Sequence, residues 1–239
     1  MKSNKIALIG YTGLIGSNFF NQIKKKKFKI EKFNSKNISK ISSTNKYDFV
    51  FCSALPAEKW FANKYPRKDY KNMKNLINKI KKINTKLFIL VSTIDVNFRH
   101  TYGKNRLEFE KFISKKFKKK IIIRLPGVFG KGLKKNIIFD LINKKNLENI
   151  FINDKFQWYD LASISKDTLK LIRDKKTGLF ELYSQPIQNS EILKFFPKIN
   201  IKSKRKKPVL YSFKPKNGYF TDKKIILSRI KKFIKSNEF

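Results

Sequence analysis

The stretch KIALIGYTGLIGSNFF, residues 5–20, decides the fold class of this chain. It opens with a short apolar run, residues 5–9, which predicts a buried strand. The glycine loop, residues 10–16, follows, and apolar spacing then predicts a helix over residues 14–25. Glycines at this spacing, between a strand and a helix, are typical of a loop that binds a pyrophosphate on the free N–H groups of the helix N-terminus. A turn with a purely structural role is the alternative.

Strands and helices continue to alternate after the glycine loop. Alternating apolar residues predict a strand at residues 28–33, and apolar runs predict three more, at residues 47–54, 87–91 and 121–125. Apolar residues at helical spacing predict one helix that opens at Pro66 and another that carries Leu107 and Ile113. This order predicts an α/β protein with a Rossmann-type doubly wound parallel sheet and a small C-terminal α/β lobe.

The second half of the chain is more mixed in pattern. Helices are predicted after Gly132, over 164–172, over 191–196 and at the C-terminus behind Thr221 or Asp222; strands are predicted over 156–159 and 179–183. The basic segment KSKRKKP, residues 202–208, is predicted to be an exposed loop.

The charge of the chain is extreme, because its 239 residues include 57 Lys and Arg against 17 Asp and Glu, a net charge of +40. Only seven of the basic residues are Arg, the residue that best reads guanine edges and clamps phosphates. The lysines are spread along the whole chain, so we expect a solvated lysine surface and no specific nucleic-acid partner. A nucleic-acid binder remains an alternative that rests on charge alone. The positive field also attracts anionic small molecules such as nucleotides.

The single cysteine and the single histidine argue against a disulfide-stabilised protein and a zinc protein. Cys52 is the one cysteine and His100 the one histidine, so neither a disulfide framework nor a Cys/His zinc cluster is expected, and we expect no metal. No apolar run approaches the ~18 residues of a membrane span. The N-terminus resembles a signal peptide, but Tyr11 and Thr12 interrupt its apolar stretch. We therefore expect a cytoplasmic protein with no membrane partner.

Three ordered segments resemble the extended short-chain dehydrogenase/reductase superfamily, specifically its NAD-dependent epimerase/dehydratase branch. They are the glycine loop with Gly10, Gly13 and Gly16, the strand end Val91-Ser92-Thr93-Ile94-Asp95-Val96, and the run Tyr102-Gly103-Lys104-Asn105-Arg106. The last two are similar to the family's Ser-Ser-x-x-Val and Tyr-Gly-x-x-Lys patterns. The resemblance implies a dinucleotide-binding domain over residues 1–131 and a smaller substrate-binding lobe over 132–239, which partly returns to the core sheet.

The resemblance also implies a catalytic group of Thr93, Tyr102 and Arg106. In the family, a tyrosine exchanges a proton with the substrate oxygen while a Ser or Thr hydroxyl holds that oxygen. A lysine four residues after the tyrosine binds the nicotinamide ribose and favours the phenolate, whose phenol otherwise has a pKa near ~10. Here Arg106 stands in place of that lysine, and its delocalised charge is not equivalent to an ammonium.

The implied cofactor is NAD(P). Its expected contacts are the glycine loop, with Gly10, Thr12, Gly13, Leu14, Ile15 and Gly16, together with Ser35, Lys36 and Arg106. NAD-preferring loops place an acid at the end of the second strand, but Glu31 comes too early there. Lys36 is suited to a 2′-phosphate, so the sequence leans to NADP.

The expected substrate is a nucleotide-activated sugar, bound by Ser92, Asp95, Lys135 and Asn136. Dehydratases of the family carry two adjacent acids after the threonine, whereas this chain has only Asp95, so keto-sugar reduction or C4 epimerisation is expected. Asp95 either takes part in epimerisation or caps a turn, and His100 either binds a phosphate or sugar or is plain surface. The alternative is a catalytically degenerate NAD(P)-binding sensor or scaffold. A homodimer is left open.

Overall fold

The computed structural model describes residues 4–41, 44–203, 205 and 207–236. The chain forms two compact units. The first contains Met1–Arg124 and Ile164–Phe180, and the second contains Leu125–Ser163 and Glu181–Phe239. The first unit therefore takes up a later segment of the chain, and the two units are built from alternating stretches of sequence.

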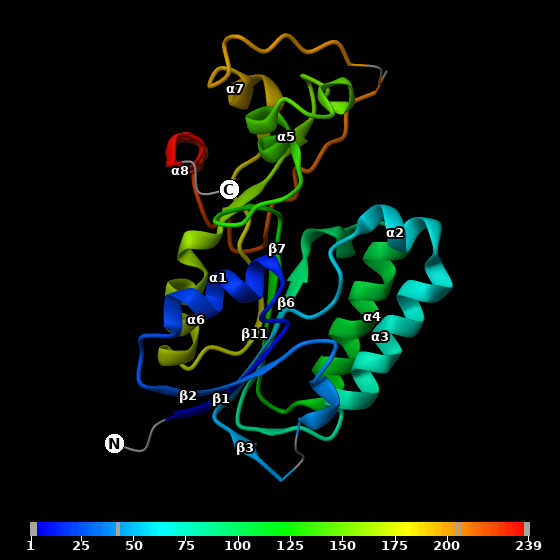
Figure 1. The fold of residues 1–239 in the computed structure, drawn as a ribbon, viewed down its shortest axis with the longest axis vertical. Helices are drawn as coiled ribbons and strands as arrows, with labels where there is room; N and C mark the ends of the chain where they lie inside the picture. Colours follow the sequence, from blue (N-terminus) through cyan, green and yellow to red (C-terminus); the bar gives the residue numbers. More distant parts are fainter. Residues whose placement is uncertain (1–3, 42–43, 204, 206, 237–239) are drawn as a thin grey trace. The chain divides into compact units, whose positions relative to one another are not determined.

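The first unit is built on a six-stranded parallel sheet, which confirms the predicted Rossmann-type α/β class (Figure 1). The strand order across it is β11-β7-β6-β4-β1-β2. The strands are β1 (Asn4–Ile9), β2 (Phe28–Phe33), β4 (Phe49–Cys52), β6 (Phe88–Thr93), β7 (Lys120–Leu125) and β11 (Gly178–Glu181).

The order of the strands contains one reversal. Strand β1 pairs with β2 on one side and with β4 on the other, so the chain builds outward in one direction and then crosses back. Connections that leave two adjacent parallel strands in opposite directions open a crevice at their carboxyl ends, where ligands of α/β proteins bind. The glycine loop follows β1, and Ser53 follows β4, at this crevice.

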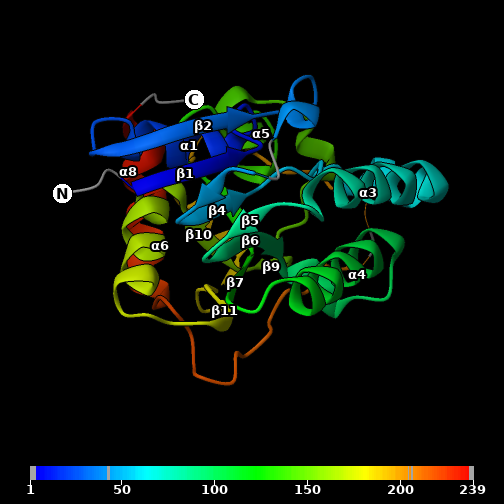
Figure 2. The same ribbon diagram turned by 90° about the horizontal axis from the view of Figure 1, so that it is seen from below.

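Helices cover both faces of the sheet, as the doubly wound prediction requires (Figure 2). Helices α1 (Leu14–Ile23) and α6 (Ile164–Arg173) lie on one face, and α3 (Pro66–Ile80) and α4 (Thr101–Lys116) lie on the other. On the first face, Phe51 stacks on Phe19 of α1 with ring centroids 3.8 Å apart. Its neighbours Val50 and Cys52 join the core cluster of the second face. Because successive residues of a strand point to opposite faces, a strand covered on both sides is apolar at every position.

Several predicted elements differ from those observed. The expected strand over 47–54 is shorter, because β4 contains only Phe49–Cys52, and the helix expected over 14–25 ends at Ile23. Helix α2 (Lys59–Lys64) was not predicted, nor was the small strand pair β3 (Lys46–Tyr47) and β5 (Asn84–Thr85). These elements are two to six residues long, too short for a periodic pattern to show in the sequence. Short 3₁₀ turns occur at Ile38–Lys40, Ile94–Asn97, Leu147–Asn149 and Leu161–Ser163.

The second unit contains short strands and three helices among its described residues. Its elements are β8 (Gly127–Phe129), α5 (Ile137–Asn143), β9 (Lys155–Phe156), β10 (Trp158–Asp160), β12 (Ile187–Gln188), α7 (Asn189–Leu193) and α8 (Lys223–Ser236). The strand predicted over 156–159 divides at Gln157 into β9 and β10. The Gln157 side chain explains the break, because it donates to Ser184 O at 2.8 Å and accepts from Phe213 N at 2.9 Å.

The other predictions for the second half hold with shifted ends. Helix α6 occupies the range expected for 164–172, β11 begins one residue before the expected 179, and α7 lies slightly before the expected 191–196. Asp222 immediately precedes α8, and its carbonyl accepts the N–H of Ile226 at 3.1 Å. In the segment 202–208, Lys204 and Lys206 lie outside the described residues. Arg205 holds the segment to the buried Asp154 through two bonds of 2.7 Å.

Among the residues that the structure describes, no helix has the length and apolar character needed to cross a membrane. Within the same residues, no group of three or more His, Cys, Asp and Glu side chains is arranged to hold a metal ion.

Candidate active site at the carboxyl ends of β1, β4 and β6

The glycine loop joins β1 to α1 with a tight turn at Gly10. Gly10 has a φ of +88°, and its N–H donates to Phe33 O of β2 at 2.8 Å. A Cβ on Gly10 would lie 2.7 Å from Ser53 O, so both the backbone conformation and the packing require glycine there. A Cβ on Gly16 would collide with the carbonyl of Gly10, because helix α1 packs directly against the turn.

Gly13 differs from its two partners in the loop. Its φ of −77° suits any residue, and an added Cβ would meet only Gly10 O, at an ordinary 3.5 Å. Gly13 is exposed and occupies the N-cap position of α1, where no side chain caps the helix. Neither the fold nor the packing therefore requires glycine at position 13. The loop has the shape of a cradle that a side chain would fill and that leaves the helix N-terminus open to an anion.

The loop after β2 carries no free acid beside the glycine loop. Glu31 is engaged elsewhere: it pairs with Lys5 at 2.9 Å and accepts the Tyr47 hydroxyl at 2.6 Å. Asn34 organises the turn, since its Oδ1 accepts the Lys36 N–H at 2.9 Å and its Nδ2 donates to the Tyr11 hydroxyl at 3.4 Å. Ser35 and Lys36 are exposed at the tip of this turn.

Lys32, which was not expected to belong to the site, lies at the end of β2, one residue before its last. Its ammonium stands 5.3 Å from the centroid of the Tyr11 ring. One cation from the strand end and one from the turn therefore accompany the glycine loop.

Thr93 ends β6 and begins a short turn, η2 (Ile94–Asn97). Its Oγ1 accepts the Asp95 N–H and donates to Asp95 Oδ2, both at 3.2 Å. Asp95 also binds Lys59 Nζ of α2, at 2.9 Å. Of the two roles left open for Asp95, the structure shows a contact within the turn, between Asp95 and the Thr93 hydroxyl. This contact places the Asp95 carboxylate beside that hydroxyl.

His100 is the N-cap of α4, the helix that carries Tyr102. Its Nδ1 accepts the Gly103 N–H at 3.1 Å, and its Nε2 lies 3.1 Å from Asp95 Oδ1. Since Nδ1 accepts, the ring is neutral with its proton on Nε2, which donates to Asp95. Burial and the nearby Lys59 lower the His100 pKa below its ordinary value of 6.5, against the opposing effect of Asp95.

Tyr102 and Arg106 are adjacent and buried on α4. The Arg106 guanidinium lies 4.4 Å from the Tyr102 ring centroid, and the two residues are 5% and 7% exposed. Asp69 of α3, only 2% exposed, grips that guanidinium with two bonds of 2.9 and 3.0 Å. The guanidinium also donates to Pro56 O, at 2.7 Å. Asn105 Nδ2 donates to the same Asp69 carboxylate at 2.8 Å.

Burial raises the pKa of the Tyr102 phenol above its ordinary value of 10. The Arg106 charge opposes this shift, whereas the Asp95 and Asp69 carboxylates add to it. The tyrosine position therefore favours the neutral phenol despite the arginine beside it.

The remaining predicted substrate residues take part in separate contacts. Ser92 Oγ donates to Glu110 Oε1 of α4 at 2.6 Å, and Glu110 pairs with Arg124 at 2.8 Å. Asn136, in the second unit, is the N-cap of α5 and accepts the N–H groups of Ile138 and Phe139 at 3.0 and 3.2 Å. Lys135 is exposed beside it.

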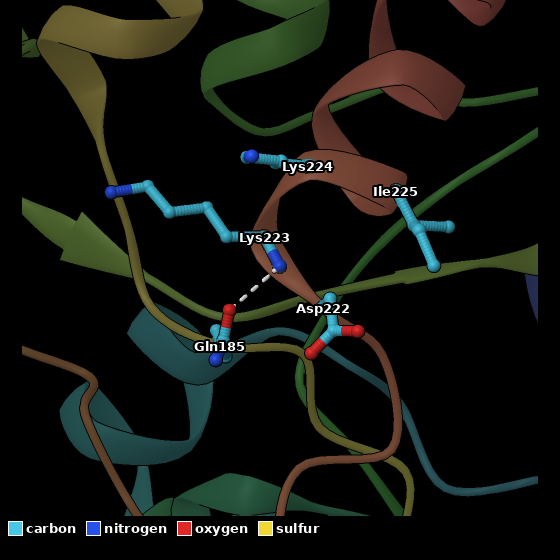
Figure 3. A pocket seen from close by; sticks show the side chains of 5 residues that line it. All are labelled: Gln185, Asp222, Lys223, Lys224 and Ile225. Carbon is cyan, nitrogen blue, oxygen red and sulfur yellow. Dashed lines mark hydrogen bonds between the residues drawn. The ribbon is translucent and has the colours of Figure 1, made fainter.

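A hollow of about 470 Å³ lies in the second unit at the start of α8 (Figure 3). Its lining residues are Gln185, Asp222, Lys223, Lys224 and Ile225. Gln185 Oε1 accepts the Lys223 N–H at 2.9 Å, which caps the helix. None of the predicted site residues lines this hollow, so it does not belong to the candidate active site.

Sequence reasoning missed the most important partner in the site, Asp69. A signal was present, because Asp69 falls on the same helical stripe as the apolar residues Met73 and Ile77. A carboxylate on the buried face of a helix needs a partner, and that need points to a buried cation. Which cation it binds depends on the packing of α3 against α4.

Gly13 and Gly16 are expected to respond differently to a methyl group. Gly16→Ala should lower the free energy of unfolding by about 1–3 kcal/mol, because its Cβ overlaps a backbone carbonyl. Gly13→Ala should be neutral or slightly stabilising. Urea unfolding of both variants measures this, and equal losses would contradict the cradle geometry.

The His100 cap predicts a pH dependence of stability. Since the pKa of His100 is below 6.5 in the folded chain, the unfolded chain binds the proton more readily, and stability falls as the pH drops below about 6.5. His100→Asn keeps a capping acceptor that does not titrate, so the difference in free energy of unfolding between wild type and variant should change with pH across this range. A constant difference would contradict the neutral cap. Nitrogen NMR of the single histidine reads its tautomer directly.

No protein-family model matches the chain, and no curated protein matches it either. Solved structures do resemble it over nearly its whole length. A dTDP-4-dehydrorhamnose reductase from Bacillus anthracis, solved with NADP, has 14% identity and a TM-score of 0.80, with 99% of each chain covered.

Two further structures show the same likeness. A dTDP-4-dehydrorhamnose reductase from Clostridium acetobutylicum has 18% identity and a TM-score of 0.76, covering 98% of this chain and 100% of that one. A UDP-N-acetylglucosamine 4-epimerase from Methanobrevibacter ruminantium, solved with UDP-N-acetylmuramic acid, has 15% identity and a TM-score of 0.77, with 98% of each chain covered. The chain therefore has the fold of the extended short-chain dehydrogenase/reductase enzymes, as the sequence resemblance predicted.

Proposed function

We propose that this chain is an NAD(P)-dependent enzyme that acts on a nucleotide-activated sugar, by keto-sugar reduction or C4 epimerisation. The observation that carries the proposal is Gly13, a glycine that neither backbone strain nor packing explains, at the switch point of a parallel sheet. A dinucleotide pyrophosphate explains it, because the phosphate oxygens need to approach the backbone at that point. The fold neighbours include reductases and epimerases whose substrates are nucleotide sugars.

In this proposal the first part of the chain, residues 1–131, binds the dinucleotide. The pyrophosphate lies on the glycine loop, with Thr12, Leu14 and Ile15 presenting backbone groups. The bound nicotinamide supplies or accepts the hydride. Residues 132–239 contribute sugar contacts, with Lys135 as one exposed cation there and Asn136 setting the start of α5.

We also propose a preference for NADP over NAD. Glu31 is committed to Lys5 and Tyr47, so no carboxylate is left to bind the ribose hydroxyls at the end of β2. Ser35, Lys36 and Lys32 instead form a polar and cationic edge suited to a 2′-phosphate.

The proposed proton-transfer residue is Tyr102, with the Thr93 hydroxyl holding the substrate oxygen. The Thr93 hydroxyl already takes part in a turn of fixed geometry, which limits the positions that a substrate oxygen can occupy. Ser92 supports the end of β6 through its hydrogen bond to Glu110, and Arg106 holds the Tyr102 ring in place.

A second candidate function is a catalytically degenerate dinucleotide sensor or scaffold. One observation favours it: Asp69 and Pro56 already engage the Arg106 guanidinium, whereas the family's lysine binds the nicotinamide ribose. Such a protein would bind NADPH with the same loop but turn over no nucleotide sugar.

The first test of the proposal is cofactor binding, followed by NADPH fluorescence. Gly13→Val should weaken binding by at least tenfold, because its branched side chain fills the pyrophosphate cradle, while its unfolding free energy stays close to that of wild type. Lys36→Ala should weaken binding of NADPH more than of NADH, and Lys40→Ala, an exposed lysine in the following turn, serves as the control. Unchanged NADPH binding by Gly13→Val would show that the loop has only the structural role of a turn.

The second test is turnover by Tyr102→Phe. Loss of the proton-transfer group should lower the rate with a nucleotide-linked keto sugar and NADPH by about 10²–10⁴-fold, and NADPH binding should stay near that of wild type. Full turnover by the variant would show that another group transfers the proton. NADPH binding by wild type with no turnover of any nucleotide sugar would favour the sensor.

A further inference from the structure

Helix α2 leads directly into α3 (Figure 1), and this segment exposes three aromatic side chains to solvent. Trp60 is 64% exposed, Tyr65 36% and Tyr70 38%. No other large hydrophobic side chain among the described residues is as exposed as Trp60. Single exposed hydrophobic side chains are ordinary on protein surfaces, whereas a group of them marks an interaction site. Three rings in one short segment form such a group.

The rings are held in place by neighbouring side chains. Phe61 contacts both Trp60 and Tyr65, with ring centroids 5.9 Å and 5.2 Å away, and it meets the indole edge to face. The Tyr70 hydroxyl donates to Glu108 Oε1 of α4 at 3.1 Å. A flat ring that is already fixed loses little conformational freedom when a ligand stacks on it. The segment therefore presents preformed stacking positions.

The exposed charges of α2 and α3 are all positive. Asp69 is the only acid in the two helices, and it is buried against Arg106. Glu108 of α4 reaches the edge of the segment, where it pairs with Lys74 at 3.1 Å. We call the three exposed rings and the exposed cations around them the α2–α3 surface. Its cations are Lys64, Arg67, Lys68, Lys71 and Lys74.

Rings and cations alternate on the α2–α3 surface. The ammonium groups of Lys64 and Lys68 stand 5.5 Å and 5.1 Å from the centroid of the Tyr65 ring, and that of Lys74 stands 5.1 Å from the Tyr70 ring. A ligand that matches this pattern carries flat groups joined by negative charges. Single-stranded nucleic acids have this chemistry, because each unpaired base is attached to a phosphate.

We propose that the α2–α3 surface binds a single-stranded nucleic acid without preference for its sequence. Unpaired bases stack on Trp60 and Tyr65, and the surrounding ammonium and guanidinium groups bind the phosphates. The charge of the chain alone does not select this partner, because lysines occur along the whole sequence; the exposed rings do. Few arginines are needed, since no base edges are read. This binding is separate from the proposed reaction.

Other occupants fit the α2–α3 surface less well. A surface that enters an anionic membrane exposes aliphatic side chains beside its aromatic ones. On α3, however, Leu76 is half-buried, and Ile77 and Ile80 are buried. A second copy of the chain in a twofold contact would place this cationic surface against itself. A nucleic-acid duplex offers phosphates, but its paired bases are not free to stack on the rings.

The first test is the affinity for a fluorescent oligothymidylate of about ten nucleotides, followed by anisotropy. Trp60→Leu keeps an apolar side chain but removes the flat ring, so it should weaken binding by at least about fivefold. Trp60→Phe keeps a ring and should bind nearly as tightly as wild type. Phe220→Leu is the control, because Phe220 is a 44% exposed ring in the second unit. Wild-type affinity in Trp60→Leu would overturn the proposal.

The second test is the salt dependence of the same binding. Lys68→Ala removes one phosphate contact, so the slope of log affinity against log salt should become shallower by about 0.7. Lys232→Ala is the matched control, since it removes an exposed lysine from α8, whose one aromatic residue, Phe233, is buried. Its slope should equal that of wild type. Equal changes in the two variants would show that the whole lysine surface binds, and would overturn the proposal.

The third test separates the other occupants. Trp60→Leu should bind a DNA duplex of the same length as well as wild type does, because stacking plays no part there. Equal losses for duplex and single strand would contradict the stacking role of Trp60. Tighter binding to vesicles of phosphatidylserine and phosphatidylcholine than to the oligothymidylate would instead identify a lipid surface. A dimer in sedimentation velocity that Trp60→Leu abolishes would identify a contact between copies, and either result would overturn the proposal.

Discussion

The ion pair between Asp69 and Arg106 is the interaction on which the candidate site depends. It joins α3 to α4 at a buried point, and it holds the guanidinium against the ring of Tyr102. Asn105 binds the same carboxylate, so α4 is fixed to α3 on two successive residues. Breaking such a buried pair by removing one partner typically costs about 3–5 kcal/mol, because the other charge remains buried. The position of the tyrosine and the stability of the helix pair are thus linked.

The glycine loop imposes the second constraint, at the carboxyl end of β1. Gly10 and Gly16 are required by the turn and by the packing of α1, whereas neither the turn nor the packing requires glycine at position 13. The first unit therefore combines a glycine loop fixed by its packing with a tyrosine held against a buried ion pair. The contact between His100 and Asp95 connects the start of α4, which carries Tyr102, to the turn that follows Thr93.

Much of the first unit could be predicted from its sequence, since β1 and β7 contain apolar runs and β2 alternates between apolar and charged residues. Helix α2 could not, because KWFANK is too short to show a period. The sequence predicted individual residues of the site but not the contacts between them. Tyr102 and Arg106 stood out by their spacing, but the pairing of Arg106 with Asp69 joins positions 37 residues apart and depends on helix packing.

The most direct measurement of the central claim is the fate of an isotope. The protein is incubated with NADPH that carries deuterium at the transferred position of the nicotinamide, and with a nucleotide-linked 4-keto sugar. Mass spectrometry of the product should show one deuterium on the former carbonyl carbon and stoichiometric NADP. Given NADP and a nucleotide sugar with a 4-hydroxyl group instead, an epimerase would invert that carbon with no net consumption of the dinucleotide. Bound NADPH with no labelled product, across nucleotide-linked keto sugars, would contradict the account.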